Sequence, residues 1–259
     1  MRFLRVVFMP AQWQVSRMNR IPRIFTHSAP QHSSALTLSG DDAHYLLNVL
    51  RVKPGQHLEL FDGSGSVWPA SVSERGRRDL TLALEPVLRV DNESPLDLTL
   101  ELSVTKGERF EWALQKATEL GARRIQPIIS ERSEARLSAE RHSKREARWH
   151  SIIVSACEQS KRAVLPQLLP LSELTELASI TAPTLGLVLA PGQGQAWPSQ
   201  CPGSLRALIG PEGGLSDDEI AWAQAQGYQG IGLGSRILRA ETAAVTVASL
   251  CQSRYGDLG

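Results

Sequence analysis

The chain has 259 residues, enough for one large or two modest domains, and its 42% hydrophobic content is ordinary for a soluble globular protein. A net charge of +1 excludes a histone-like polycation, and no apolar run approaches the roughly 18 residues that a membrane-spanning helix needs. Arg5 interrupts the apolar start of the chain and no small-residue cleavage site follows, so we expect no signal peptide. Cys157, Cys201 and Cys251 lie far apart without a C-x-x-C pair, which indicates unpaired thiols in a reducing cytosol.

Charged residues are unevenly distributed along the chain. Residues 1–90 hold 11 Lys and Arg against 7 Asp and Glu, and residues 123–150 hold 8 against 4. Local basic surfaces allow a near-neutral protein to bind nucleic acid. For residues 131–150, a solvated helix face is the alternative interpretation.

The N-terminal part of the chain predicts a small β-barrel over residues 18–90. Residues 1–17 match no later pattern, and we expect them to be an N-terminal extension ahead of Met18. Two-residue alternation and turn residues predict short strands, and DGSG at 62–65 is a hairpin turn signal. The expected elements are a strand followed by a helix within 36–52, and strands at 56–63, 66–74 and 79–88.

After a turn-rich linker at 90–95, strands alternate with helices. The expected strands are 96–105, 123–130, 184–191, 205–211 and 228–234, and the expected helices are 107–121, 138–161, 216–227 and 241–256. Gly121 is placed to end the first helix, and Ser216 with Glu219 forms a capping box at the start of the third. This alternation predicts an α/β domain with a mainly parallel sheet over residues 91–259.

Three glycine-containing loops each follow a predicted strand of this domain. They are LAPGQG at 189–194, IGPEGG at 209–214 and LGSRILRAE at 233–241. Ligands bind outside the carboxyl ends of the strands in open α/β sheets, so the three loops together predict one binding site. A P-loop is excluded because no lysine follows the glycines, and the spacing does not match a dinucleotide fingerprint.

Four charged side chains in these loops are candidates for chemistry. Glu212 and Glu241 are the carboxylates there, and Glu212 either braces its loop or takes part in contacting a cation or removing a proton. Arg236 and Arg239 suit an anionic or electron-rich partner, although packing or ion pairing remains open for either. No histidine pair has metal-ligand spacing and no Ser-His-Asp set is visible, so we expect no metal.

Long motifs of this chain resemble the SPOUT methyltransferases of the ribosomal RNA small subunit methyltransferase E type. IGPEGGLSDDEI followed by LGSRILRAETAAV resembles the C-terminal signature of that family. KGERFEWALQKATELGARRIQPIISERS and ACEQSKRAVLP resemble its central motifs, and NRIPRIF and LNVLRVKPGQHLELFDGSG resemble its N-terminal domain. The resemblance runs from about Met18 to Tyr255.

The resemblance implies a fold, a reaction and partners. It implies a PUA-like RNA-binding β-barrel followed by an α/β domain tied in a trefoil knot. It further implies a cytoplasmic homodimer that uses S-adenosylmethionine to methylate N3 of a uridine in 16S rRNA of the small ribosomal subunit. Two alternatives remain: a SPOUT enzyme acting on another nucleotide, such as a tRNA ribose 2′-hydroxyl, and a non-catalytic RNA-binding assembly protein.

The resemblance also implies roles for particular residues. The cofactor pocket would be lined by Leu189, Gly194, Ile209, Gly210, Gly213, Gly214, Leu233, Leu238 and Arg239. Glu212 would be the carboxylate that takes part in removing the proton, with Arg236 and Arg239 stabilising the charge. In the barrel, RNA would be contacted by Arg20, Arg23, Arg51 and Lys53. In the α/β domain, a partner subunit would contribute Arg132 and Arg162 to the RNA contact.

Overall fold

The computed structural model describes residues 21–27, 33–133, 139–190, 192, 196–200 and 203–259, with the backbone alone for 139–142. The predicted extension at 1–17 lies outside these residues. The chain divides into two compact units that meet between Asp91 and Asn92.

The first unit is built on a mostly antiparallel sheet in the order β1-β3-β4-β5-β2, with β6 paired to β4. Its strands are β1 (Arg23–Phe25), β2 (Ala35–Leu38), β3 (His57–Phe61), β4 (Ser66–Arg75), β5 (Leu80–Leu84) and β6 (Leu88–Arg89). The hairpin predicted at 62–65 joins β3 to β4, where Gly63 and Gly65 adopt positive φ angles of 80° and 92°. Strand β1 pairs with β3 in parallel, which short-range alternation did not reveal.

One helical segment closes the core of this unit. Helix α2 (Gly40–His44) continues directly into a π-helical turn η2 (Tyr45–Val49). Its apolar spacing places Ala43, Leu46 and Leu47 in the core formed by the sheet. The helical periodicity of the sequence therefore marks the face that is buried.

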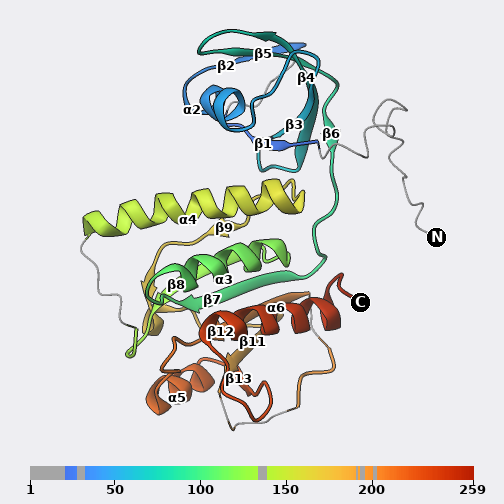
Figure 1. The fold of residues 1–259 in the computed structure, drawn as a ribbon. Coiled ribbons are helices and arrows are strands. Elements are labelled where there is room, and N and C mark those ends of the chain that lie inside the picture. The colour runs from blue at the N-terminus through green and yellow to red at the C-terminus, as the bar shows by residue number, and fades with distance from the viewer. Residues whose placement is uncertain (1–20, 28–32, 134–138, 191, 193–195, 201–202) are drawn as a thin grey trace, which may run out of the picture. The chain divides into compact units, whose positions relative to one another are not determined.

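The second unit contains a parallel sheet in the order β10-β8-β7-β12-β11-β13, with β9 paired to β8 (Figure 1). Its strands are β7 (Asp97–Ser103), β8 (Arg124–Ile129), β9 (Gln167–Leu168), β10 (Ser172–Glu173), β11 (Thr184–Leu189), β12 (Ser204–Ile209) and β13 (Tyr228–Ile231). All of these pairings are parallel, so the carboxyl ends of the strands lie along one edge.

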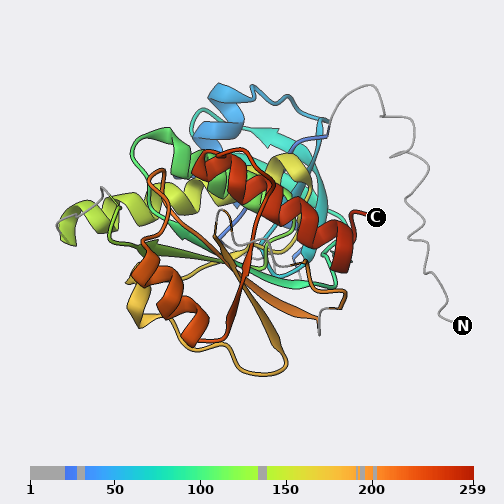
Figure 2. The same cartoon turned by 90° about the horizontal axis from the view of Figure 1, so that it is seen from below.

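Helices cover both faces of this sheet (Figure 2). They are α3 (Glu108–Glu119), α4 (Ala139–Ser160), α5 (Asp217–Ala225) and α6 (Ala240–Tyr255), with a 3₁₀ turn η3 (Leu174–Glu176). Helices α3, α4 and α6 share one hydrophobic core with the sheet, and α5 shares a second core on the opposite face. Gly121, with φ 79°, follows the end of α3, and the Ser216–Glu219 capping box starts α5, so both predicted helix boundaries are confirmed.

Chain order and spatial order differ in the second unit. Strand β12 lies between β7 and β11, and β13 lies on the far side of β11. After β13 the chain returns to α6, which packs on β7 and β12. This return brings the start of α6 next to the segments that follow β7 and β12.

A buried polar cluster joins three strands of the parallel sheet. Glu101 on β7 is 1% exposed and accepts hydrogen bonds from Arg206 Nε at 2.6 Å and from the Tyr228 hydroxyl at 2.8 Å. Burial raises the pKa of the Glu101 carboxyl, and the Arg206 guanidinium opposes that rise. Gly186 on β11 is paired with both Arg206 and Tyr228, so no side chain separates them on this face. The cluster therefore links β7, β12 and β13 across one face of the sheet.

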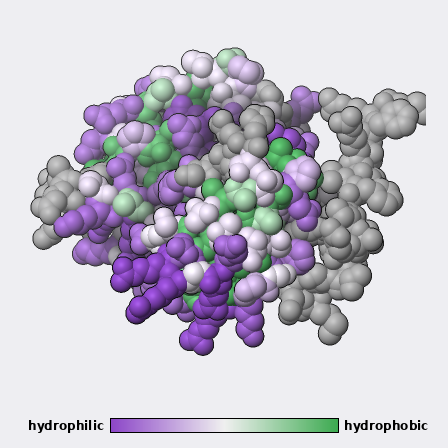
Figure 3. Space-filling view, turned by 90° about the horizontal axis from the view of Figure 1, so that it is seen from above, coloured by the Kyte–Doolittle hydropathy of each residue, from purple (hydrophilic) through white to green (hydrophobic). Residues whose placement is uncertain are grey.

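Few of the large apolar side chains that the structure describes are exposed. In the face drawn in Figure 3, hydrophilic residues predominate and the hydrophobic ones form small separate patches. Among the described residues, no helix is long and apolar enough to span a membrane. Ile237 stands out because it is 92% exposed.

Candidate active site

The candidate site lies at the carboxyl edge of the parallel sheet. The loops predicted to hold a ligand follow β11, β12 and β13, which are neighbours in the sheet. Gly194, in the first of these loops, lies outside the described residues. The topology therefore brings together three loops that lie far apart in the chain, between residues 189 and 241, as expected for strands in an open parallel sheet.

The GPEGG loop after β12 is a tight turn. The Gly214 amide donates to the Pro211 carbonyl at 2.9 Å, and Gly214 has a φ angle of 69°. A methyl group added at Gly210 would lie 2.8 Å from the backbone nitrogen of Leu215. The loop's own closure therefore requires glycine at 210 and favours it at 214, whether or not a ligand approaches.

Two arginines from other elements hold this loop. Arg109 Nη1, from the first turn of α3, lies 2.8 Å from Glu212 Oε1. Arg132 Nη1, which follows β8, donates to the Gly213 carbonyl at 2.8 Å and is 3.4 Å from that of Leu215. Arg132, predicted to contact RNA, is thus engaged with the loop of its own chain. Of the two readings of Glu212, the geometry favours a loop brace.

The loop between β13 and α6 carries both half-buried and exposed side chains. Leu233 and Leu238 are half-buried and pack on the same core as Leu189. Arg236 and Arg239 are exposed, and within the part of the chain that the structure describes neither side chain has a hydrogen-bond or ion-pair partner. The loop therefore packs Leu233 and Leu238 against the domain and exposes two cations together with Ile237.

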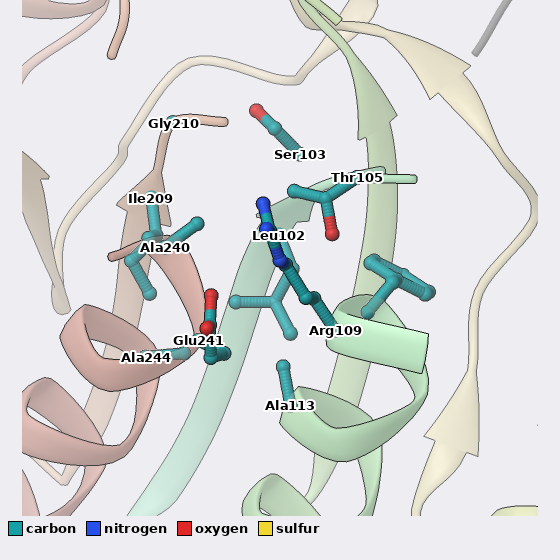
Figure 4. A pocket seen from close by; sticks show the side chains of 11 residues that line it. Leu102, Ser103, Thr105, Arg109, Ala113, Ile209, Gly210, Ala240, Glu241 and Ala244 are labelled. Carbon is teal, nitrogen blue, oxygen red and sulfur yellow. The ribbon is translucent and has the colours of Figure 1, made fainter. Parts of the chain in front are cut away.

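A small pocket lies beside these loops, between the ends of β7 and β12 and the first turns of α3 and α6 (Figure 4). Its volume is about 10 Å³. The lining residues are Leu102, Ser103, Thr105, Arg109, Phe110, Ala113, Ile209, Gly210, Ala240, Glu241 and Ala244. Ile209 and Gly210, both predicted to bind the cofactor, line it, so the pocket adjoins the candidate cofactor site.

Sequence reasoning missed most of the polar residues of this pocket. Ser103, Thr105 and Arg109 were not singled out, and Glu241 was noted only as a loop carboxylate. The available signal was S-x-T directly after a buried strand, but hydroxyls at a strand end are common and carry little information by themselves. Their meeting with Glu241, more than 130 residues away, depends on the return of the chain to α6.

The predicted RNA-binding residues of the first unit separate into two kinds. Arg51 and Lys53 are exposed after η2, where Arg51 has a φ angle of 52°. Arg23 is 8% exposed and its Nε lies 2.9 Å from Glu59 Oε2, which argues against contact with phosphate. Arg20 lies outside the described residues.

Arg162 holds a structural position in the second unit. It is 5% exposed, and its Nη1 donates to the carbonyls of Thr118 at 2.7 Å and Ala122 at 3.0 Å. Its guanidinium also pairs with Glu93. These contacts tie the end of α3 to the linker, and the burial argues against the predicted contact with RNA.

No group of three or more His, Cys, Asp or Glu residues that could hold a metal ion occurs among the residues described. Cys157 and Cys251 are buried free thiols. Cys201 lies outside the described residues.

Comparisons with known proteins agree with this architecture. A family model described as an RNA methyltransferase domain matches residues 92–252, and one described as an RNA methyltransferase PUA domain matches residues 38–85. The fold and the site thus define an RNA methyltransferase with an N-terminal PUA domain.

Individual relatives narrow the class. The chain is 36% identical over 225 residues to ribosomal RNA small subunit methyltransferase E of Synechocystis sp., covering 81% of this chain and 70% of that protein. It is 30% identical to the protein of that name from Buchnera aphidicola subsp. Schizaphis graminum, covering 92% and 98%. The crystal structure of the Neisseria gonorrhoeae enzyme of that name, bound to S-adenosyl methionine, is 34% identical, with a TM-score of 0.84 over 93% of this chain and 100% of that one.

The chain belongs to the ribosomal RNA small subunit methyltransferase E family. The resemblance read from its motifs is confirmed. The predicted fold class, a SPOUT methyltransferase domain preceded by a small PUA-like domain, is confirmed as well.

Proposed function

We propose that this protein transfers a methyl group from S-adenosylmethionine to N3 of a uridine in 16S rRNA. The observation that carries the proposal is the GPEGG loop, which Arg109 and Arg132 hold at the carboxyl end of β12. Family membership supplies the class of reaction, and the site supplies a place for cofactor and base next to each other.

The residues present fit this cofactor. Leu189 ends β11, and Leu233 and Leu238 lie in the loop between β13 and α6; all three are half-buried apolar groups, suited to an adenine ring. Around Gly214 a space of 4 Å from the Cβ position is open, so the loop backbone is approachable there. When bound, S-adenosylmethionine supplies an electrophilic methyl group on a positively charged sulfur. The proposed pocket residues are Leu189, Gly194, Ile209, Gly210, Gly213, Gly214, Leu233, Leu238 and Arg239.

Methylation at uridine N3 requires that a proton leave this nitrogen and that charge spread onto the base carbonyls. Arg236 and Arg239 are exposed cations on the loop that precedes α6, available to phosphate or to an electron-rich base. The Glu212 carboxylate is already engaged in an ion pair with Arg109. We therefore assign Glu212 to holding the loop and the two arginines to the substrate.

RNA is proposed to meet the first unit at Arg51 and Lys53. Both side chains are exposed in a region with an excess of basic residues, as phosphate contact requires. We further propose that the protein is a homodimer and that it acts in the cytoplasm, where ribosomal subunits are assembled. Light scattering coupled to size-exclusion chromatography tests the dimer.

Mass-spectrometric mapping of 16S rRNA tests the reaction. Purified protein, S-adenosylmethionine and small ribosomal subunits from a deletion strain should yield one N3-methyluridine that is absent before incubation. Free 16S rRNA, incubated in parallel, shows whether assembly is needed. A methyl group on another nucleotide would show that a different SPOUT activity is present. Absence of methylation together with absence of cofactor binding would show a non-catalytic RNA-binding protein.

A further inference from the structure

The pocket beside the GPEGG loop contains buried polar atoms that lack partners. The side-chain oxygens Ser103 Oγ, Thr105 Oγ1 and Glu241 Oε2 are inaccessible to solvent and have no hydrogen-bond partner among the described residues. Ser103 is 3% exposed and Thr105 6%. All three residues line the same pocket.

Such atoms point to a missing partner. A buried polar group without a hydrogen bond costs about 1–3 kcal/mol, and native proteins keep few of them. Three of them line one pocket here. The volume of about 10 Å³ corresponds to about one water molecule, so no more than a polar edge of a ligand fits there and a whole ring does not.

The pocket offers donors on one side and an acceptor on the other. Ser103 and Thr105 present hydroxyls from the end of β7, and Glu241 presents a carboxylate oxygen from α6. In Figure 4 the Arg109 side chain reaches from α3 into the space between Thr105 and Glu241. A ligand edge that carries an acceptor next to a donor would satisfy these groups.

We propose that this pocket binds the imide edge of the target uracil and that Glu241 is the base that takes the N3 proton. This inference rests on the proposed function. One base carbonyl accepts from the hydroxyls and Arg109, and N3–H donates to Glu241. Since Ile209 and Gly210 line both this pocket and the proposed cofactor site, the edge lies next to the methyl donor.

The proton and the methyl group exchange at one nitrogen. The N3–H bond breaks first and its proton passes to the Glu241 carboxylate, and the electron pair left on N3 then forms the new N–CH₃ bond along the direction that the proton has vacated. The S–CH₃ bond breaks, its electron pair stays on sulfur, and the cofactor leaves as neutral S-adenosylhomocysteine. The initial charges of +1 on sulfur and −1 on the carboxylate are both removed. Arg109 stabilises the negative charge that develops on the carbonyl oxygen.

The same geometry discriminates against cytosine. Cytosine presents a donor at its exocyclic amine and an acceptor at N3, the reverse of uracil. Its N3 lone pair would face the Glu241 carboxylate, which as an ionised group only accepts. Like-polarity contacts of this kind are an effective way to exclude the wrong ligand.

Single-turnover methylation of small ribosomal subunits tests the base. E241Q should slow the chemical step by about 100-fold or more, while S-adenosylmethionine affinity and the free energy of unfolding change little. Substituting 5-fluorouridine at the target, which acidifies N3–H, should rescue E241Q more than the wild-type protein. D218N, at an exposed carboxylate in the first turn of α5, should match the wild-type rate.

A binding measurement tests the pocket without turnover. The alanine methyl signals of the full chain are recorded by NMR in the presence of S-adenosylhomocysteine while uridine is added. The signals of Ala113, Ala240 and Ala244 should shift, and that of Ala223, on the opposite face of the sheet, should not. Cytidine should shift them about tenfold more weakly, and the double variant S103A/T105V should lose that discrimination. Equal shifts with both nucleosides, or none, would show that the pocket holds structural water only.

The outcomes separate this inference from the proposed function. If the wild-type protein makes no N3-methyluridine, the function itself fails. If it does and E241Q retains the wild-type rate, or if 5-fluorouridine gives no selective rescue, Glu241 is not the base. E212Q, measured in parallel, should not be rescued by 5-fluorouridine, because Glu212 holds the loop.

Discussion

Arg109 Nη1 lies 2.8 Å from Glu212 Oε1, although 103 residues separate them in the chain. The pair connects the first turn of α3 to the GPEGG loop after β12. Both side chains are part-exposed, at 48% and 33%, so solvent screens their attraction. The contact therefore orients a loop more than it stabilises the fold.

R109A should separate these two effects. We expect the free energy of unfolding to fall by less than about 1 kcal/mol, because exposed pairs contribute little. The single-turnover methylation rate should fall about 100-fold, because the variant loses both the contact that positions the loop and the proposed stabilisation of charge on the base carbonyl. Urea denaturation and quench-flow methylation measure the two quantities. R109K keeps the charge but not the planar fork, so its methylation rate should lie between those of the wild type and R109A. A wild-type rate for R109A would refute the positioning role.

G210A should weaken cofactor binding. The added methyl group would lie 2.8 Å from the Leu215 backbone nitrogen, so the GPEGG loop must shift. We expect S-adenosylmethionine affinity, measured by calorimetry, to fall by about tenfold or more, since 1.4 kcal/mol already gives that factor. G55A is the control: Gly55 has a φ angle of 81° in the first unit, so its replacement strains the backbone without touching the site. Equal losses for both variants would mean that the effect is one of stability.

R51A/K53A should reduce RNA affinity and flatten its dependence on salt. Each lost phosphate contact lowers the slope of log K against log[salt] by about 0.7 to 0.9. Filter binding to 16S rRNA between low and moderate salt measures that slope. R77A/R78A removes the same charge from another exposed stretch of the unit. If both double variants change the slope equally, net charge and not a specific contact surface governs binding.

R162A should destabilise the protein by about 3–5 kcal/mol, because it leaves a mostly buried carboxylate and two carbonyls without their partner. Those groups are Glu93, Thr118 and Ala122. Urea denaturation measures the loss. R123A is the control, since the Arg123 guanidinium is half-exposed and 3.9 Å from Asp97, and it should cost less than about 1 kcal/mol. A small effect of R162A on stability with a large one on RNA affinity would restore the RNA-binding role.

Y228F should alter the stability of the protein at alkaline pH. Burial, and to a lesser extent the negative Glu101, raises the pKa of the Tyr228 hydroxyl above its ordinary value of 10.0. Above about pH 10 the unfolded chain therefore releases a proton that the folded protein retains, so the wild-type free energy of unfolding falls as pH rises.

The slope of that fall is about 1.4 kcal/mol per pH unit for one proton. Y228F should lack this component, so the stability difference between wild type and Y228F should shrink between pH 10 and 11. Urea denaturation at each pH gives the difference. A constant difference across the range would show that Tyr228 ionises as readily in the folded protein as in the unfolded chain.

The sequence by itself determined the elements of this protein and its family. Period-2 and helical patterns located the strands and helices because they follow from local burial, and the caps at Gly121 and Ser216 ended or began helices through bonds to near neighbours. The GPEGG and ILRAETA motifs indicated the ligand loops because each lies within one contiguous stretch.

Only the tertiary structure decided which side chains meet. Arg132 and Arg162, predicted to face RNA, are held by carbonyls that belong to distant segments, and a basic residue in the sequence carries no sign of that burial. Ser103, Thr105 and Glu241 converge because β12 inserts beside β7 and the chain returns from β13 to α6. Strand order in a parallel sheet is set by non-local packing, which local sequence patterns do not encode.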